Sequence, residues 1–427
     1  MNENLDWIKY IFDKDNIEEA RKKVCANKGS AGIDRIKVEE LAWYIDKNIN
    51  DIINKVYKRK YKPVPVKRVE IPKENGKKRQ LGIPTVMDRV IQQAIIQRLA
   101  PVYEKEFSDS SFGFRIGRSC EQAIIRALEL INDGYNWIVD IDLERFFDTV
   151  NHDRLTNIIS RTIKDGNLIS LIRAYLDSGV MINGKYEDTP VGTPQGGNLS
   201  PLLSNIMLNE LDKELESRGL KFVRYADDCL ILVGSKKAAE RVMQSIVKFI
   251  EKKLGLKVNA EKSRIARPQD IKYLGFGFYY DEERCYPRVH EKSIEKLKRK
   301  LKQLTNRSWS VSLDLRIEKI NQVVRGWVNY FKICNMKIHM ENISSHLRRI
   351  RCVIWKQWKV PSKRLESLMK LGISKMMAEK YACSGNRYWK MSMTPVIHKA
   401  ISNKRLQKRG LLCPIDQYNK VHILSIG

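Results

Sequence analysis

The stretch that decides the fold is Leu220-Lys221-Phe222-Val223-Arg224-Tyr225-Ala226-Asp227-Asp228-Cys229-Leu230-Ile231-Leu232-Val233. Two apolar-rich segments flank a Tyr-Ala-Asp-Asp sequence, which predicts two short strands joined by a tight turn. The hairpin would carry two adjacent carboxylates, Asp227 and Asp228, at its tip. Because neighbouring carboxylates repel each other, such a tip is stable when it is fully solvated or when a divalent cation neutralises it.

A second acidic segment lies upstream, at Trp137-Ile138-Val139-Asp140-Ile141-Asp142-Leu143. Its side chains alternate with period two, so Ile138, Asp140 and Asp142 would share one face of a strand. Oxygen ligands at strand ends suit Mg²⁺, and two such ions can activate a hydroxyl and stabilise a leaving pyrophosphate. The alternation alone leaves open whether Asp140 or Asp142 is the third carboxylate of such a site.

Five segments, taken together, resemble the reverse transcriptases encoded by bacterial group II introns, which are also called maturases. They are the Tyr-Ala-Asp-Asp hairpin, residues 142–148 with Asn151-His152, residues 193–202, Tyr273-Leu274-Gly275-Phe276, and Gly326-Trp327-Val328-Asn329-Tyr330-Phe331. The resemblance extends from about residue 27 to about residue 331. No single segment is decisive, but five in this order and spacing are specific.

The resemblance implies a right-hand polymerase that adds dNTPs to a primer 3′ end on an RNA template and releases pyrophosphate. In the family motif the metal-binding acid stands five residues before the second phenylalanine, which selects Asp142 rather than Asp140. Two Mg²⁺ ions would therefore be held by the catalytic residues Asp142, Asp227 and Asp228, with Leu143 as a further ligand.

The resemblance also implies which residues contact the incoming dNTP. Phe147 would be the aromatic gate that excludes a 2′-hydroxyl, whereas on its own it could equally be an ordinary core aromatic. The other implied dNTP contacts are Lys73, Arg79, Gln195 and Lys262. Arginine and lysine bind phosphate well, but Lys73 and Arg79 taken alone would simply be basic residues on an exposed hairpin.

Template and primer contacts are implied for six further residues, namely Arg115, Arg118, Gly196, Tyr225, Leu274 and Gly275. Gly196 would permit close approach of the backbone to a base pair, although a loop turn is the plain alternative. We interpret His152 as structural, because phosphoryl transfer needs positioning and metals more than a histidine base. Trp355 and Trp358 either stack on bases or belong to the core.

The predicted fold class is α+β. Strands, helices and a hairpin alternate as in a polymerase palm, a split βαβ sheet backed by helices, and an all-α thumb and a small basic domain follow. The predicted domains are an N-terminal extension at 1–60, fingers and palm at 61–285, a helical thumb at 286–365 and a DNA-binding region at 366–427. Apolar residues at 294, 297, 301 and 304 recur with helical spacing in the thumb.

Positive charge is concentrated in the C-terminal third. The 427 residues carry a formal net charge of +29, and residues 290–427 contain 30 Lys and Arg against 8 Asp and Glu, a net +22. A polyanion is expected there, since counterion release drives nucleic acid onto cationic surfaces. A merely solubilising surface would mix the signs more evenly.

The implied partners are the parent intron RNA, an RNA template with a DNA primer, target DNA and dNTPs. The implied activities include assisting splicing and copying the intron after its insertion into DNA. The eight cysteines form no Cys-x-x-Cys pair, which argues against a disulfide framework or a zinc site and indicates a reduced, cytosolic protein. The resemblance implies that this cytoplasm is bacterial. No membrane segment or secretory signal is recognisable. Without the paired cysteines of an HNH nuclease, the resemblance is to the compact class that lacks this domain.

Three other functions fit parts of the pattern. A maturase that folds intron RNA without polymerising would not need all three acids, which are present here. A reverse transcriptase of a retron or a diversity-generating system would lack the thumb segment around Trp327. An RNA-templated RNA polymerase would accept rNTPs, so the preference between dNTPs and rNTPs distinguishes it. The sequence leaves the oligomeric state open.

Overall fold

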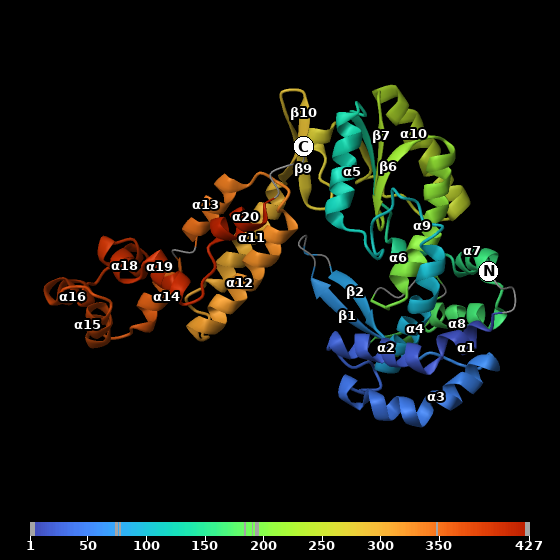
Figure 1. Ribbon diagram of the computed structural model, residues 1–427, viewed down its shortest axis with the longest axis horizontal. Coiled ribbons are helices and arrows are strands. Elements are labelled where there is room, and N and C mark those ends of the chain that lie inside the picture. Colours follow the sequence, from blue (N-terminus) through green and yellow to red (C-terminus); the bar gives the residue numbers. More distant parts are fainter. Residues whose placement is uncertain are drawn as a thin grey trace. The chain divides into compact units, whose positions relative to one another are not determined.

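The computed structural model describes residues 5–72, 76, 78–182, 185–189, 191–192, 196–346 and 349–422, without the side chains of residues 79, 345 and 346. The chain splits into two compact units, Met1–Arg267 and Pro268–Gly427, both drawn in Figure 1. The finer division into four domains stays a prediction. Within the described ranges, none of the helices combines the length and the apolar character that crossing a bilayer requires.

The first unit begins with helices that surround one continuous apolar core. They are α1 (Trp7–Ile11), α2 (Lys14–Ala26), the 3₁₀ turn Val38–Glu40, α3 (Leu41–Tyr57), α4 (Val86–Tyr103) and α5 (Cys120–Asn132). Asp13, Thr85 and Ser119 cap α2, α4 and α5 by accepting main-chain N–H groups, as short polar residues do at helix starts.

The first sheet is mixed and has the strand order β2-β1-β4-β5. Its strands are β1 (Val66–Pro72), β2 (Lys78–Ile83), β4 (Val180–Ile182) and β5 (Lys185–Glu187). β1 pairs antiparallel with β2 and parallel with β4. β1 and β2 follow each other in the chain, and the sequence between them contains Asn75-Gly76, a dipeptide typical of tight hairpin turns.

The second sheet has the order β6-β7-β3-β8, with all neighbours antiparallel. Its strands are β3 (Trp137–Ile141), β6 (Lys221–Tyr225), β7 (Asp228–Val233) and β8 (Arg264–Ala266). The segment between β3 and β6 contains α6 (Phe146–Thr149), α7 (His152–Thr162), α8 (Gly166–Leu176) and α9 (Ser200–Ser217). Consequently β6 runs parallel to β3 with β7 inserted between them, the split strand–helix–strand arrangement expected from the sequence. After β7, α10 (Lys236–Phe249) and a π-helical turn (Ile250–Leu254) complete the layer of helices.

The second unit opens with the 3₁₀ turn Pro268–Asp270 and the antiparallel hairpin β9 (Phe276–Asp281) and β10 (Arg284–Val289). The helices that follow are α11 (Glu291–Leu304), α12 (Leu313–Tyr330), α13 (Lys337–His346), α14 (Arg349–Gln357), α15 (Pro361–Lys370), α16 (Lys375–Ala382), α17 (Tyr388–Ser392), α18 (Pro395–Ala400), α19 (Asn403–Lys408) and α20 (Pro414–Val421). On α11, Ile294, Leu297 and Leu301 are buried while Lys296 and Arg299 are exposed. This confirms the predicted amphipathic pattern.

A buried ion pair lies directly beneath the β6–β7 turn. Arg224 and Asp212 are both fully buried, and Arg224 Nε donates to Asp212 Oδ1 at 2.7 Å. Arg224 Nη1 also donates to the carbonyl oxygen of Ala226 at 2.9 Å and to Asn205 Oδ1 at 3.1 Å. The guanidinium therefore ties helix α9 to the turn that carries Asp227.

The loop before α5 closes against the same turn. Phe112 N donates to Arg224 O at 2.8 Å, and Asn205 Nδ2 donates to Gly113 O at 2.8 Å. A Cβ at Gly113 would lie 2.3 Å from Ala226 N, which is too close for any side chain. Ala226 itself has φ 58°, a left-handed conformation that costs a non-glycine residue on the order of 1 kcal/mol. The surrounding contacts hold the turn in this conformation.

We expect Asp212→Ala to destabilise the first unit by about 3–5 kcal/mol, because it leaves the Arg224 charge buried without its partner. Chemical denaturation, followed by far-UV circular dichroism, measures this change. Glu129→Ala is the matched control, since it removes an exposed partner of Arg126 on α5 and should cost less than about 1 kcal/mol. Similar midpoints for the two variants would contradict the prediction.

Candidate active site

The strand register brings the predicted catalytic acids to one end of the second sheet. Ile141 at the end of β3 pairs with Cys229 of β7, so Asp142 comes next to Asp228, as successive cross-strand neighbours do. Asp227 lies in the turn between Tyr225 and Asp228, which pair with each other. Residues about 85 positions apart in the chain are thus neighbours in space, while their catalytic role stays a prediction.

Two carboxyl groups at this end of the sheet, those of Asp140 and Asp228, have raised pKa values. Burial, together with the neighbouring carboxylates of Asp227, Asp140 and Asp142, raises the pKa of Asp228 to about 6, and Lys262 opposes the rise. Burial likewise raises the pKa of Asp140 to about 6, with Arg264 opposing and Asp142 contributing. Like charges that are partly removed from water favour protonation or a bound cation. The end of the sheet is therefore a site of unbalanced negative charge.

A short segment after α10 frames Asp142. Asp142 N donates to Ser263 Oγ at 3.0 Å, and Asn259 N donates to Asp142 O at 2.8 Å. Lys262 Nζ lies 3.1 Å from Asp142 Oδ2 and 3.3 Å from Oδ1. Lys262, predicted to contact the dNTP, therefore pairs here with a predicted metal ligand, and its side chain remains largely exposed.

The donor set matches the oxygen ligands that Mg²⁺ prefers. Leu143 forms an antiparallel bridge with Val258 whose hydrogen bonds use Asp142 O and Glu144 N, so this bridge does not occupy the Leu143 carbonyl. In the described part of the chain, however, no three His, Cys, Asp or Glu side chains already surround a common point. The strand register places the acids next to one another. To bind an ion, the carboxylate of Asp142 would have to turn away from Lys262.

Phe146 and Phe147 follow the acid-bearing strand and differ in exposure. Phe146 is 2% exposed, and its ring meets that of Phe147 edge to face at 5.3 Å. Phe147 is half-buried, so the core position is that of Phe146. A Cβ at Gly192 would lie 2.8 Å from Phe147 O, which shows that Gly192 packs tightly on this aromatic turn.

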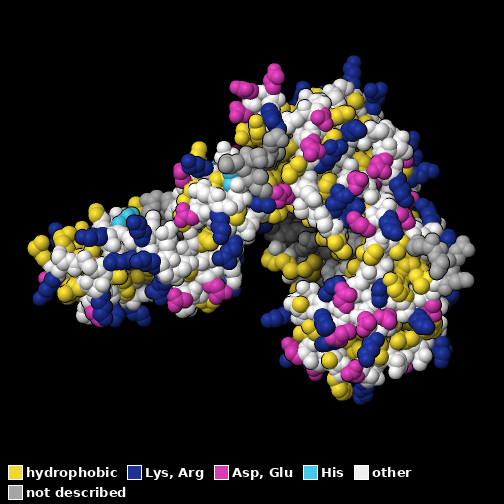
Figure 2. Space-filling model, in the orientation of Figure 1, with side chains coloured by type: hydrophobic (Ala, Val, Ile, Leu, Met, Phe, Trp, Pro, Cys, Tyr) yellow, Lys and Arg dark blue, Asp and Glu magenta, His cyan; other side chains and the backbone are white. Residues whose placement is uncertain are grey.

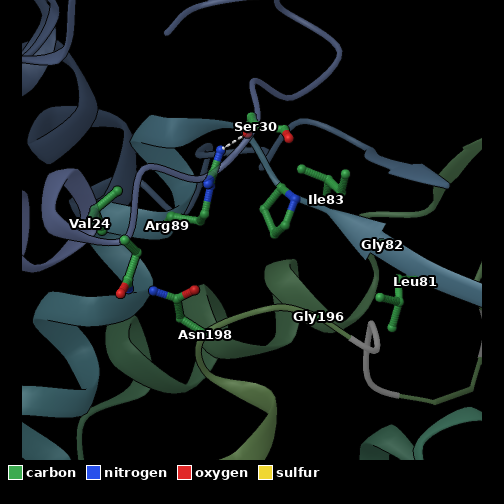
Figure 3. A pocket seen from close by; sticks show the side chains of 10 residues that line it. Val24, Ser30, Leu81, Gly82, Ile83, Arg89, Gly196 and Asn198 are labelled. Atoms are coloured by element: carbon green, nitrogen blue, oxygen red, sulfur yellow. Dashed lines mark hydrogen bonds between the residues drawn. The ribbon is translucent and has the colours of Figure 1, made fainter. Parts of the chain in front are cut away.

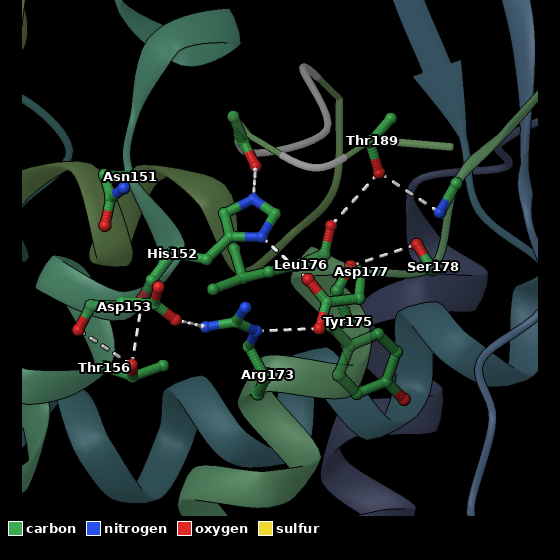
Figure 4. A network of polar contacts seen from close by, with 12 residues as sticks. Asn151, His152, Asp153, Thr156, Arg173, Tyr175, Leu176, Asp177, Ser178 and Thr189 are labelled. Atoms are coloured by element: carbon green, nitrogen blue, oxygen red, sulfur yellow. Dashed lines mark hydrogen bonds and ion pairs between the residues drawn. The ribbon is translucent and has the colours of Figure 1, made fainter. Parts of the chain in front are cut away.

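His152 connects Gly192 to the C-terminal end of helix α8 (Figure 4). Its Nδ1 lies 2.8 Å from Asp177 Oδ1 and its Nε2 lies 2.6 Å from Gly192 O. Arg173 Nε donates to Asp177 Oδ2 at 2.7 Å, and Thr189 Oγ1 donates to Leu176 O at 3.2 Å. These contacts anchor the residues just before 193–195 and agree with a structural role for the histidine.

Gly196 lies against the first sheet and borders a pocket of about 270 Å³ (Figure 3). The φ of Gly196 is 114°, and a Cβ there would lie 2.5 Å from Gly82 O. Close contact with the backbone of β2 in this protein therefore requires glycine at position 196. Arg89, also in the pocket lining, donates to the carbonyl of Ser30. The pocket lies between the loop after α2, the end of β2 and the start of α9.

The structure changes the interpretation of some predicted contacts. Arg115 is buried, pairs with Glu104 and donates to the carbonyls of Ser108 and Ser111, so it holds its loop together and is not placed to reach a template. Arg118 is partly exposed and pairs with Asp109. Trp355 is 1% exposed and belongs to the core.

Other predicted residues lie elsewhere or outside the described residues. Lys73 and Gln195 are outside them, as is the side chain of Arg79. Leu274 and Gly275 belong to the second unit, where they form a tight turn with φ values of 50° and 86°. Tyr330 Oη donates to Leu274 O at 2.9 Å, which fixes this turn to α12.

The residues that support the acids do not stand out in the sequence. These are Arg224, Asp212, Asn205, Gly113 and Ser263. One signal was present, because an arginine that directly follows two apolar residues of a strand, Phe222 and Val223, is expected to need a buried partner. The identity of that partner on α9 follows only from the fold.

Comparison with known proteins agrees with this architecture. Residues 71–278 match the family model "Reverse transcriptase (RNA-dependent DNA polymerase)", and residues 294–372 match "Group II intron, maturase-specific domain". The two matches lie on either side of the short segment that leads from β9 to α11. The chain thus has a reverse transcriptase domain followed by a helical maturase domain.

Individual relatives are about a third identical to the chain over the residues that align. Protein YkfC of Escherichia coli (strain K12) is 31% identical over 303 residues, which cover 62% of this chain and 80% of YkfC. Group II intron-encoded protein LtrA of Lactococcus lactis subsp. cremoris is 32% identical over 345 residues, covering 64% of this chain and 57% of LtrA. The chain therefore matches little more than half the length of LtrA. It belongs to the family of group II intron reverse transcriptases and maturases.

Proposed function

We propose that this protein is an RNA-directed DNA polymerase of right-hand architecture that also acts as the maturase of its parent group II intron. The observation that carries the proposal is the register of β3 and β7, which makes Asp142 the neighbour of Asp228. The first unit would supply the fingers and the palm. Helix α11 and the helices after it would form the thumb and a DNA-binding region.

Two Mg²⁺ ions, when bound, would activate the primer 3′-hydroxyl and stabilise the leaving pyrophosphate. Asp142, Asp227, Asp228 and the Leu143 carbonyl would hold them. Lys262 would exchange its pairing with Asp142 for the triphosphate, since its exposed ammonium group can reach either partner. The half-buried Phe147 would lie under the sugar and exclude a 2′-hydroxyl. Arg224 and Asn205 would keep the turn in place while charges change around it.

The maturase activity would depend on the second unit. Lys and Arg side chains gather on its visible face in Figure 2, and residues 290–427 carry a net +22, which suits the backbone of intron RNA and target DNA. We infer that the protein binds its intron, promotes splicing and copies the intron by target-primed reverse transcription. A maturase without polymerase activity remains the alternative, and the retained acids favour the polymerase.

Substituting the acids separates these two functions. We expect Asp227→Asn and Asp142→Asn to lower primer extension on an RNA template by about a hundredfold or more, because each removes a charged ligand from the reacting centre. Filter binding of intron RNA should be unchanged in both variants. Asp133→Asn, an exposed acid at the end of α5, is the control and should extend normally. Extension that survives Asp227→Asn would refute the site.

Acidification should raise the Mg²⁺ requirement. The pKa of Asp228 is about 6, so at about pH 5.5 roughly three quarters of this carboxyl would carry a proton that Mg²⁺ must displace. The Mg²⁺ concentration for half-maximal extension should rise about fourfold relative to pH 7.5. Asp140→Asn removes a neighbouring negative charge and should move this rise to lower pH. An identical requirement at both pH values would contradict the assignment.

Shortening the gate residue should relax sugar selection. We expect Phe147→Ala to lower the preference for dNTPs over rNTPs by roughly tenfold or more, since the ring would no longer meet the 2′-hydroxyl. Single-nucleotide incorporation kinetics with each substrate give the ratio of kcat/KM values. Phe147→Tyr keeps the ring and should retain the preference. Equal ratios for wild type and Phe147→Ala would remove Phe147 from this role.

A further inference from the structure

The second unit contains a basic pocket that no part of the polymerase proposal uses. It has a volume of about 300 Å³ and is lined by Thr305, Asn306, Arg307, Arg349, Cys352 and Trp389. Its walls are the turn after α11, the start of α14 and helix α17. The volume is at the lower end of the range for small-ligand sites.

One wall of the pocket is fixed from within the protein. Arg316 is 1% exposed and donates to the carbonyls of Leu304, Asn306 and Trp309, while its guanidinium lies 4.9 Å from the Trp309 ring. A single buried guanidinium thus holds three carbonyls of the turn. Because the turn is held in one conformation, little ordering would accompany the binding of a ligand.

The opposite wall is tied to the same turn. Arg349 Nε donates to Thr305 Oγ1 at 3.0 Å, and Lys356 Nζ donates to Arg307 O at 3.1 Å. Arg307 itself is exposed, and its guanidinium lies 5.3 Å from the Tyr388 ring. The pocket is therefore formed before any ligand arrives, with two cationic side chains at its edge.

The lining combines positive charge with an accessible aromatic ring. Within the described ranges, neither Arg307 nor Arg349 forms an ion pair with a carboxylate. Trp389 is 50% exposed, unusual for the largest apolar side chain. Guanidinium groups bind phosphate through charge-assisted hydrogen bonds, and an exposed indole can stack on a base.

We propose that this pocket binds one unpaired nucleotide of a single-stranded nucleic acid, with its phosphate on Arg307 and Arg349 and its base against Trp389. The proposal rests on the proposed function only in taking nucleic acid as the partner of this unit. A duplex would engage the arginines through its backbone but keep its bases stacked away from Trp389. RNA and DNA strands share the required chemistry, so the test includes both.

The test compares binding of fluorescein-labelled single strands, RNA and DNA of one sequence, to the full-length protein by anisotropy at fixed salt. Trp389→Ala should weaken binding of at least one strand about fivefold or more, whereas Trp389→Phe should retain most of it. Arg307→Gln should weaken binding more than Arg325→Gln, which removes the same charge from an exposed position on α12 outside the pocket. Binding of a duplex should be unchanged by Trp389→Ala.

The proposal would be overturned if Trp389→Ala bound single strands with wild-type affinity and if Arg307→Gln and Arg325→Gln lost equal amounts of strand affinity. Equal losses in Trp389→Ala and Trp389→Phe would also count against stacking. If Trp389→Ala melts at a lower temperature than wild type, the proposal is judged from Trp389→Phe and from the comparison of Arg307→Gln with Arg325→Gln. Primer extension on a short template, measured with the same protein preparations, distinguishes failure of the polymerase proposal from failure of the pocket proposal. Wild-type protein that binds strands but extends none refutes the polymerase alone, and extension by variants with unchanged strand binding refutes the pocket alone.

Discussion

The antiparallel pairing of β3 with β7 is the interaction on which the rest of the first unit depends. Side chains in a strand alternate between faces, so a slip of one residue would turn Asp142 away from Asp228 and expose apolar residues of the same strand. Ile138, Val139 and Ile141 are all buried, which makes such a slip costly. The apolar residues of β3 therefore set the position of the acid that follows them.

Holding acids together raises the free energy of the folded protein, and the surroundings of the turn offset that cost. The raised pKa values of Asp140 and Asp228 reflect burial and mutual repulsion. Beneath them, Arg224 binds Asp212 and the carbonyl of Ala226, so the backbone of the turn is restrained even where its carboxylates repel. Because the backbone of the turn is restrained, repulsion between the carboxylates is more easily relieved by binding a cation from solvent than by rearranging the hairpin.

The second unit shows a different use of charge. Its basic residues mostly lie on exposed helix faces, whereas Arg316 is buried and serves as a multiple hydrogen-bond donor to a turn. The same residue type thus contributes to long-range attraction of a polyanion on the surface and to local order inside. Only burial distinguishes the two uses, and it decides which arginines are free to meet a ligand.

The sequence by itself determined most of the elements and singled out the acids that the second sheet brings together, because apolar periodicity and turn residues are local. Period-two alternation located β3, the Tyr-Ala-Asp-Asp turn located β6 and β7, and the order of five motifs identified the family. Tertiary structure alone decided the partners. It paired Arg224 with Asp212, assigned Lys262 to Asp142 and buried Arg115 that had been expected at the template. Such contacts join residues 11 to 120 positions apart, and a charged side chain shows in the sequence that it needs a partner but not which one the folded chain brings within reach.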